Sequence, residues 1–257
     1  MFSIRSAKWL LISKTTAAIP ASSLTAKNLS RPRRRTAAAA PAVADNLPNN
    51  PARPEDVKLF RSVADVAPTL WEDALAVEPA VVVRNSGVRF EDGRGFIVPF
   101  MNGNYIVDLK ARTIETPPGH KPAGFQKGLV LLTYLAKAQD LGLSGKMVTS
   151  RELNGGAMFF TGPHALMTEP VTEKFGAAPE DFLARAEALG FKPENQGAGF
   201  ACRGLVLPHI AVGCVLHSED DEFPAELTYT FDSYSHYHMP LDGLWAMINV
   251  LAEELAA

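Results

Sequence analysis

The feature of the sequence that most restricts its fold is a series of hairpin-turn signals between residues 85 and 103. Asn85-Ser86-Gly87, Asp92-Gly93 and Asn102-Gly103 contain residue types that tolerate the positive φ of tight turns. The segments between them are short and rich in β-branched and aromatic residues. We therefore expect a small antiparallel meander whose strands are Ala80–Arg84, Val88–Glu91, Gly95–Phe100, Asn104–Leu109 and Thr113–Glu115.

Helical spacing of apolar residues is clearest in two segments. Ala123–Leu141 carries so many apolar residues that the helix should be largely buried, and Gly142 fits its C-terminal stop. A C-terminal amphipathic helix follows from the spacing of Leu241, Trp245, Ile248 and Leu251. Shorter helices are expected over Glu55–Val66, Pro68–Val77 and Glu180–Leu189, with Pro170 interrupting a further helical stretch.

A second group of strands is expected in the C-terminal half, over Phe200–Leu207, Ile210–His217 and Leu227–Asp232. Cys202 and Cys214 fall on two of these strands and should form a buried pair of free thiols rather than a redox disulfide. Because the strands come in antiparallel clusters separated by helices, the pattern predicts an α+β fold rather than a βαβ fold.

The N-terminal segment has a different composition from the rest. Residues 1–44 contain eight Lys or Arg and no acidic residue, which is typical of an organelle transit peptide. We expect residues 1–54 to be a transit peptide and linker, and residues 55–257 to be a single α+β domain. The long Ala/Pro/Ser spacer favours the chloroplast, while a basic amphipathic helix over Phe2–Lys14 would suit the mitochondrion.

The remaining residues are acidic, which excludes some partners. Residues 45–257 hold 17 basic and 28 acidic residues, a formal charge of −11. Non-specific nucleic-acid binding needs a basic face, so no nucleic-acid partner is expected. No apolar run approaches the ~20 residues of a membrane-spanning helix, so no membrane span is expected either.

The densest polar segment lies before the C-terminal helix. His236 and His238 would point the same way in an extended segment, and Glu222 belongs to the acidic run 219–222. Two imidazoles and a carboxylate suit a zinc, iron or other divalent site. The alternative is that the acidic run is a solvated turn and that the histidines cap or pack near the last helix.

A second candidate site surrounds the segment Arg151-Glu152-Leu153-Asn154-Gly155-Gly156. Adjacent glycines let backbone amides approach a ligand, and Arg151 with Glu152 could orient it. With Asp232, these residues are the ligand-binding candidates. The alternative is a structural ion pair beside a tight turn. Common nucleotide-binding and hydrolase motifs are absent from the sequence, so no cofactor and no reaction class follow from it.

Several short motifs occur in an order that resembles a known family. They are Phe96–Phe100 with Tyr105, Ser150–Leu153 with Gly155-Gly156 and Phe159-Phe160, Asp221–Pro224, Phe231-Asp232, and the His-Tyr stretch before the last helix. Over residues 57–256 the chain is similar to an uncharacterised bacterial and archaeal family, domain of unknown function 3786. Some of its members carry an added cysteine-rich iron–sulfur domain. The resemblance therefore implies a metalloprotein or iron–sulfur partner. This chain departs from those members, since its two cysteines cannot supply a cluster domain, and any link to iron–sulfur chemistry is indirect.

Three functional interpretations follow. The preferred one is an accessory domain that binds a cofactor, a metal or a metalloprotein partner inside an organelle. The second is an enzyme of unrecognised class that uses Glu152, Asp232 and His236 or His238 as acid–base groups. The third is a structural or assembly factor whose polar motifs hold turns. Convergence of the Gly155-Gly156 turn and the His/Asp segment on one pocket would favour the first two, and separation of the two would favour the third.

Overall fold

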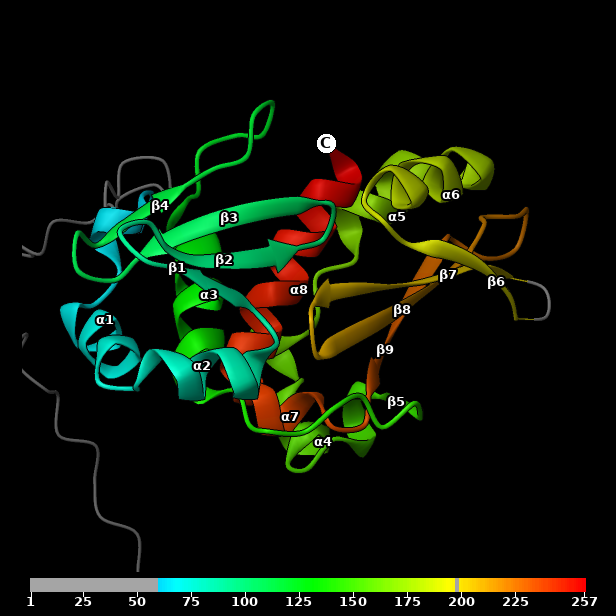
Figure 1. Ribbon diagram of the computed structural model, residues 1–257. Coiled ribbons are helices and arrows are strands. Elements are labelled where there is room, and N and C mark those ends of the chain that lie inside the picture. The colour runs from blue at the N-terminus through cyan, green and yellow to red at the C-terminus, as the bar shows by residue number, and fades with distance from the viewer. Residues whose placement is uncertain (1–59, 197–198) are drawn as a thin grey trace, which may run out of the picture. The chain divides into compact units, whose positions relative to one another are not determined.

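The computed structural model describes residues 60–196 and 199–257, and two antiparallel sheets form the framework of this part (Figure 1). The first sheet is a meander in which each strand pairs with the next along the chain. A two-residue turn closes its central hairpin, where Phe100 pairs with Gly103. The strands are β1 (Arg89–Glu91), β2 (Gly95–Phe100), β3 (Gly103–Asp108) and β4 (Thr113–Glu115).

The second sheet has five strands in the order β5-β9-β8-β7-β6. Its centre is the long hairpin β7–β8, in which Cys202 lies directly opposite Cys214. Both cysteines are buried free thiols, as the sequence predicts. The strands are β5 (Met147–Thr149), β6 (Lys192–Gln196), β7 (Gly199–Leu207), β8 (Ile210–His217) and β9 (Glu226–Asp232).

Eight α-helices among the described residues accompany the sheets, so the predicted α+β class is confirmed. They are α1 (Pro68–Leu75), α2 (Pro79–Ser86), α3 (Phe125–Lys137), α4 (Gly156–Phe159), α5 (Glu169–Phe175), α6 (Pro179–Ala188), α7 (Ser235–His238) and α8 (Leu241–Ala256). Short 3₁₀ turns are η1 (Val63–Asp65), η2 (Ser150–Glu152) and η3 (Gly162–His164). No helix of the described part is long and apolar enough to cross a membrane.

The long helices α3 and α8 pack side by side (Figure 1), and residues from both sheets join them in one hydrophobic core. A buried lysine ties these elements together. Lys127 of α3 donates to the Tyr105 hydroxyl at 3.1 Å and pairs with Glu254 of α8 at 2.7 Å. Burial alone would lower the pKa of Lys127, but its bonds with Glu254 and Tyr105 outweigh burial and raise it. Lys127 is therefore a buried, charged residue that links β3, α3 and α8.

The predicted strand Ala80–Arg84 is wrong, because these residues belong to helix α2. The three β-branched residues Val81–Val83 favour a strand locally, but two capping signals oppose it. Pro79 occupies the first turn of the helix, and Gly87 ends it with a φ of 68°. The predicted turn Asn85-Ser86-Gly87 is thus a helix C-terminus rather than a hairpin.

Other boundaries also differ from the predictions. Residues 55–59 of the expected helix Glu55–Val66 lie outside the described part, and its remainder holds only the 3₁₀ turn η1. Helix α3 ends at Lys137, so Gly142 is not its stop signal. Pro170 stands in the first turn of α5, where its missing N–H costs no hydrogen bond, so it starts a helix rather than interrupting one.

Candidate functional site

The outer face of the five-stranded sheet carries an open pocket of about 450 Å³, which we call the outer-sheet pocket. Leu143 and Leu205 stand in it with nearly half of their surface exposed. Its lining combines apolar side chains with two cations: Met101, Leu143, Met147, Leu205, Lys192 and Arg203. Both the volume and the mixture of an apolar lining with a few charged groups are those of small-molecule sites.

Strand alternation explains why this face is open. Cys202 and Cys214 point into the core, so their neighbours Arg203 and Leu205 point outward. Arg203 and Leu205 are both exposed, although they lie in a strand whose other residues are largely apolar. The sheet therefore presents a cation and a large apolar side chain on its outer surface.

One lining residue has an unusual backbone conformation. Met101, the first residue of the β2–β3 turn, has a φ of 52°. A positive φ at the first and not the second turn position is the pattern of a type II′ turn, which normally has glycine there. The Met101 N–H donates to the Val206 carbonyl of β7 at 2.9 Å, so this turn is fixed against the five-stranded sheet. The strained backbone places an apolar side chain in the pocket.

Asp232 forms part of the pocket wall and organises the loop beside it. Its carboxylate accepts hydrogen bonds from the backbone N–H groups of Ser144 at 3.0 Å, Gly145 at 2.8 Å and Tyr234 at 2.9 Å. Burial would raise the pKa of Asp232, but these donors outweigh burial and lower it. The carboxylate is therefore ionised and occupied by backbone donors.

The two cations stand side by side at one edge of the pocket. Lys192 of the edge strand β6 lies directly opposite Arg203 of β7. Like charges in directly opposite positions destabilise an antiparallel pair. Arg203 is compensated by an ion pair with Glu194. This edge is therefore suited to an anionic group.

The candidates Arg151, Glu152, Gly155 and Gly156 lie in a separate tight turn. The Glu152 carboxylate accepts from the Thr149 N–H at 2.8 Å and from the Thr149 hydroxyl at 2.9 Å, and these bonds lower the pKa of Glu152. Gly155 has a φ of 79°, and a Cβ on Gly156 would lie 1.9 Å from a backbone oxygen of the same turn. Steric and capping requirements thus account for these residue types, while Arg151 is exposed.

The segment with His236 and His238 is not extended, contrary to the expectation. It forms the single helical turn α7, in which residues two apart point in different directions. His238 is fully buried, whereas Glu222 lies in an exposed loop. Within residues 60–196 and 199–257, no group of three or more His, Cys, Asp or Glu side chains could hold a metal ion.

Asp232 is thus the one predicted candidate that lines the outer-sheet pocket. The Gly155-Gly156 turn comes close to the last helix, since a Cβ on Gly155 would lie 3.5 Å from Leu241, but it does not line the pocket. The turn and the histidines therefore do not converge with Asp232 on one pocket, which favours the structural interpretation for these motifs. Sequence reasoning missed Lys192, Arg203 and Met101. An arginine within an otherwise apolar strand was the available signal for Arg203.

A family model described as a domain of unknown function (DUF3786) matches residues 78–254. Neither the curated proteins nor the solved structures contain a match to the chain.

Proposed function

The chain belongs to the family of the domain of unknown function (DUF3786), and on that premise we propose that it is a non-catalytic, ligand-binding accessory domain. Its ligand is an amphipathic small molecule with a carboxylate or phosphate group, bound in the outer-sheet pocket. The family match spans every residue that lines this pocket.

The observation that carries the proposal is the cross-strand pair of Lys192 and Arg203. Two cations directly opposite each other repel, and Glu194 neutralises one of them. An anionic group at this edge would pair with Lys192, the cation that Glu194 leaves uncompensated. An arginine offers a planar fork of donors that suits carboxylate and phosphate groups.

The apolar part of the pocket supports a ligand with a hydrocarbon body. Leu143 and Leu205 expose 44% and 47% of their surface, and a bound hydrocarbon would cover both. Burying apolar surface contributes roughly 25 cal/mol per Å². Met101 keeps a strained turn conformation beside them, and strained backbone is concentrated at functional sites.

The state of the predicted acid–base groups favours binding over catalysis. Glu152 and Asp232 already accept hydrogen bonds from backbone N–H groups, which hold both carboxylates in the ionised form. A general acid or base needs a pKa near the working pH and access to its substrate. The buried His238 has no such access, because its side chain does not line the pocket.

A matched series of probes tests the proposal. Octyl phosphate, octanoate and octan-1-ol share one hydrocarbon chain, so isothermal titration isolates the contribution of the head group. We expect the two anions to bind at least about tenfold more tightly than the alcohol, which corresponds to about 1.4 kcal/mol. Increasing salt should weaken the anions only.

The variant Lys192→Met keeps the aliphatic side chain and removes the charge. It should lower affinity for octyl phosphate to that of octan-1-ol. Because lysine on an edge strand also discourages strand pairing, the oligomeric state of the variant is the control. Equal affinity of wild type and Lys192→Met for octyl phosphate, with both monomeric, would refute the proposal.

The targeting of the chain is a separate proposal supported by composition alone. The basic, acid-free residues 1–44 support a transit peptide within residues 1–54, with the chloroplast preferred over the mitochondrion. Mass spectrometry of the endogenous protein should find a mature N-terminus between about residue 36 and residue 54. An intact segment 1–35 would contradict this proposal.

The partner that the family resemblance implies is a metalloprotein or iron–sulfur protein. This proposal rests on the resemblance, since the described residues offer no metal-ligand cluster that would support it. Purification of the tagged protein from its own organelle, followed by iron analysis of the co-eluting proteins, tests it. If the co-eluting proteins contain no more iron than those of a mock purification, the proposal of an iron–sulfur partner is refuted.

A further inference from the structure

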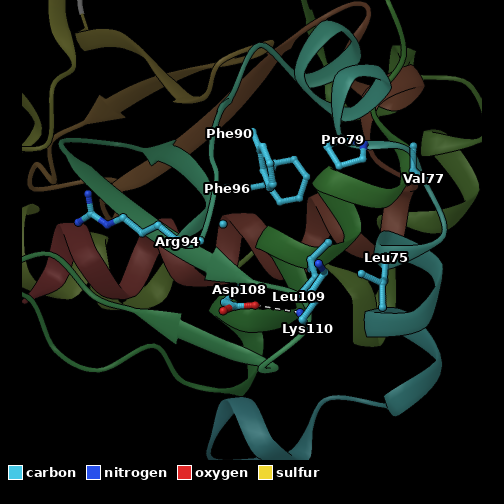
Figure 2. A pocket seen from close by; sticks show the side chains of 11 residues that line it. Leu75, Val77, Pro79, Phe90, Arg94, Phe96, Asp108, Leu109 and Lys110 are labelled. Atoms are coloured by element: carbon cyan, nitrogen blue, oxygen red, sulfur yellow. Dashed lines mark hydrogen bonds between the residues drawn. The ribbon is translucent and has the colours of Figure 1, made fainter.

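A second and smaller pocket lies between the α1–α2 connection and the β1–β2 hairpin (Figure 2). We call it the meander pocket, and its volume is about 180 Å³. Its apolar lining comes from three separate segments: Leu75, Val77, Pro79, Phe90, Phe96 and Leu109. No predicted site residue lies in it.

Two aromatic rings form one wall of the meander pocket. The ring centroids of Phe90 and Phe96 lie 4.9 Å apart with an angle of 52° between the ring planes. Figure 2 shows the two rings next to each other, with Pro79 and Leu75 on the other side of the space. Phe96 is 3% exposed and Phe90 is 39% exposed, so the wall runs from the core to the surface.

The opposite side is apolar from floor to mouth. Leu109 is 6% exposed at the floor, while Leu75 is 49% exposed at the mouth. Leu75 and Phe90 are the two large apolar side chains that this pocket exposes to water. Their exposure is unfavourable, and a bound apolar group would cover both. We therefore expect a ligand with little polar surface to bind this pocket most tightly.

Two of the three charged side chains at the rim already have partners. The Asp108 carboxylate accepts from the backbone N–H groups of Lys110 at 2.9 Å and Ala111 at 3.0 Å. Arg94 pairs with Glu91 at 3.2 Å, and Figure 2 shows its side chain directed away from the two rings. Lys110, the remaining charged residue of the lining, is exposed to solvent. None of these groups requires an ion in the pocket.

We propose that the meander pocket binds a small neutral aromatic molecule of one ring or two fused rings. A dry cavity of about 150 Å³ lined by leucine, isoleucine and phenylalanine accepts benzene, so this volume admits a ring of similar size. The Phe90–Phe96 wall offers an aromatic face and edge for offset stacking. This site is independent of the outer-sheet pocket, since the two share no lining residue.

The experiment compares toluene and indole with benzoate and benzylammonium on the full chain, using ligand-observed NMR to measure the dissociation constants. We expect both neutral probes to bind, and both charged probes to bind at least about fivefold more weakly because charge must be desolvated. Failure of both neutral probes to bind at their solubility limits would overturn the proposal. Tighter binding of either charged probe would overturn it as well.

Matched tryptophan variants locate the binding. Leu75→Trp introduces a ring at a half-exposed position, so the variant should fold and fill the meander pocket, abolishing indole binding. Leu143→Trp makes the same change at a 44% exposed position of the outer-sheet pocket and should leave indole binding unchanged. As a second measurement, Phe90→Ala should weaken indole at least fivefold. Indole binding that survives both Leu75→Trp and Phe90→Ala would place the ring elsewhere and refute the assignment.

Discussion

The rings of His209 and His238 lie 5.2 Å apart, centroid to centroid, at the junction of the β7–β8 turn and α7. The Nδ1 of His209 lies 3.1 Å from the Asn85 carbonyl, which can only accept, so Nδ1 carries the proton. The two ring nitrogens of the buried His238 make no hydrogen bond of good geometry among the described residues, and only a weak interaction with the Gly142 backbone favours the protonated ring. Burial, reinforced by the neighbouring His209, lowers the pKa of His238 to about 4.

This pair predicts a pH dependence of stability. The pKa of His238 is lower in the folded state than its usual value of about 6.5, so the unfolded chain takes up the proton first as pH falls. The free energy of unfolding should therefore drop by about 3 kcal/mol between pH 6.5 and pH 4. Urea denaturation across this range, with His238→Gln as the comparison, measures the effect. His238→Gln should lose this dependence, whereas His217→Gln, at an exposed site, should keep it.

The backbone strain at Met101 predicts a variant that separates stability from binding. Glycine accepts the φ of 52° without steric cost, so Met101→Gly should leave the denaturation midpoint unchanged or raise stability by up to about 1 kcal/mol. Loss of the apolar side chain should weaken octyl phosphate binding. Arg112→Gly, at a φ of 54°, is the control, since Arg112 does not line the outer-sheet pocket and binding should stay intact. Because Met101 also packs against the core, Met101→Ala is the reference for the lost side chain, and a Met101→Gly variant no more stable than Met101→Ala would show that the turn is not strained.

The final helix should contribute strongly to the core. Leu251 is fully buried in α8, so Leu251→Ala should cost about 2–5 kcal/mol of unfolding free energy. Leu205→Ala, at a 47% exposed position, should change it by less than about 0.5 kcal/mol. Chemical denaturation measures both, and an unchanged midpoint in Leu251→Ala would rule out a core role for the helix.

The paired cysteines should be chemically inert in the folded state. A hydrogen bond with Cys202, together with burial, raises the pKa of Cys214 well above its usual value. Because the thiolate is the reactive form, neither thiol should react with a disulfide reagent at pH 8 until urea unfolds the domain. Two thiols should then react. Rapid labelling of the native protein would contradict the buried pairing.

The sequence predicted those elements whose signals are local. The bounds of β2, β4 and β8 match the predicted strands. The turn signals Asp92-Gly93 and Asn102-Gly103 delimit β2, and Pro208-His209 precedes β8. Strand β6 was missed, since Lys192–Gln196 is polar and is held by pairing with β7 rather than by its own pattern. Helix α2 departs from the predicted strand because Pro79 in its first turn and Gly87 at its end outweigh the local strand preference of three valines.

The candidate site was mostly beyond sequence reasoning for a geometric reason. Its cations come from two strands whose register places Lys192 opposite Arg203, and Met101 reaches the pocket from the other sheet. Such a combination depends on non-local pairing. The polar motifs that stood out, Glu152 and Asp232, were instead the groups that hold turns by accepting backbone hydrogen bonds.

The buried ion pair between Lys127 and Glu254 also restricts the order in which the domain can be completed during synthesis. Until α8 has been translated, Lys127 lacks its carboxylate partner, and the apolar face of α3 lacks the cover that α8 provides. At about 5–20 residues per second, translation from the end of α3 to the end of α8 takes roughly 6–24 s. A chain that ends before α8 exposes this apolar face, so we expect it to aggregate more readily than the complete chain.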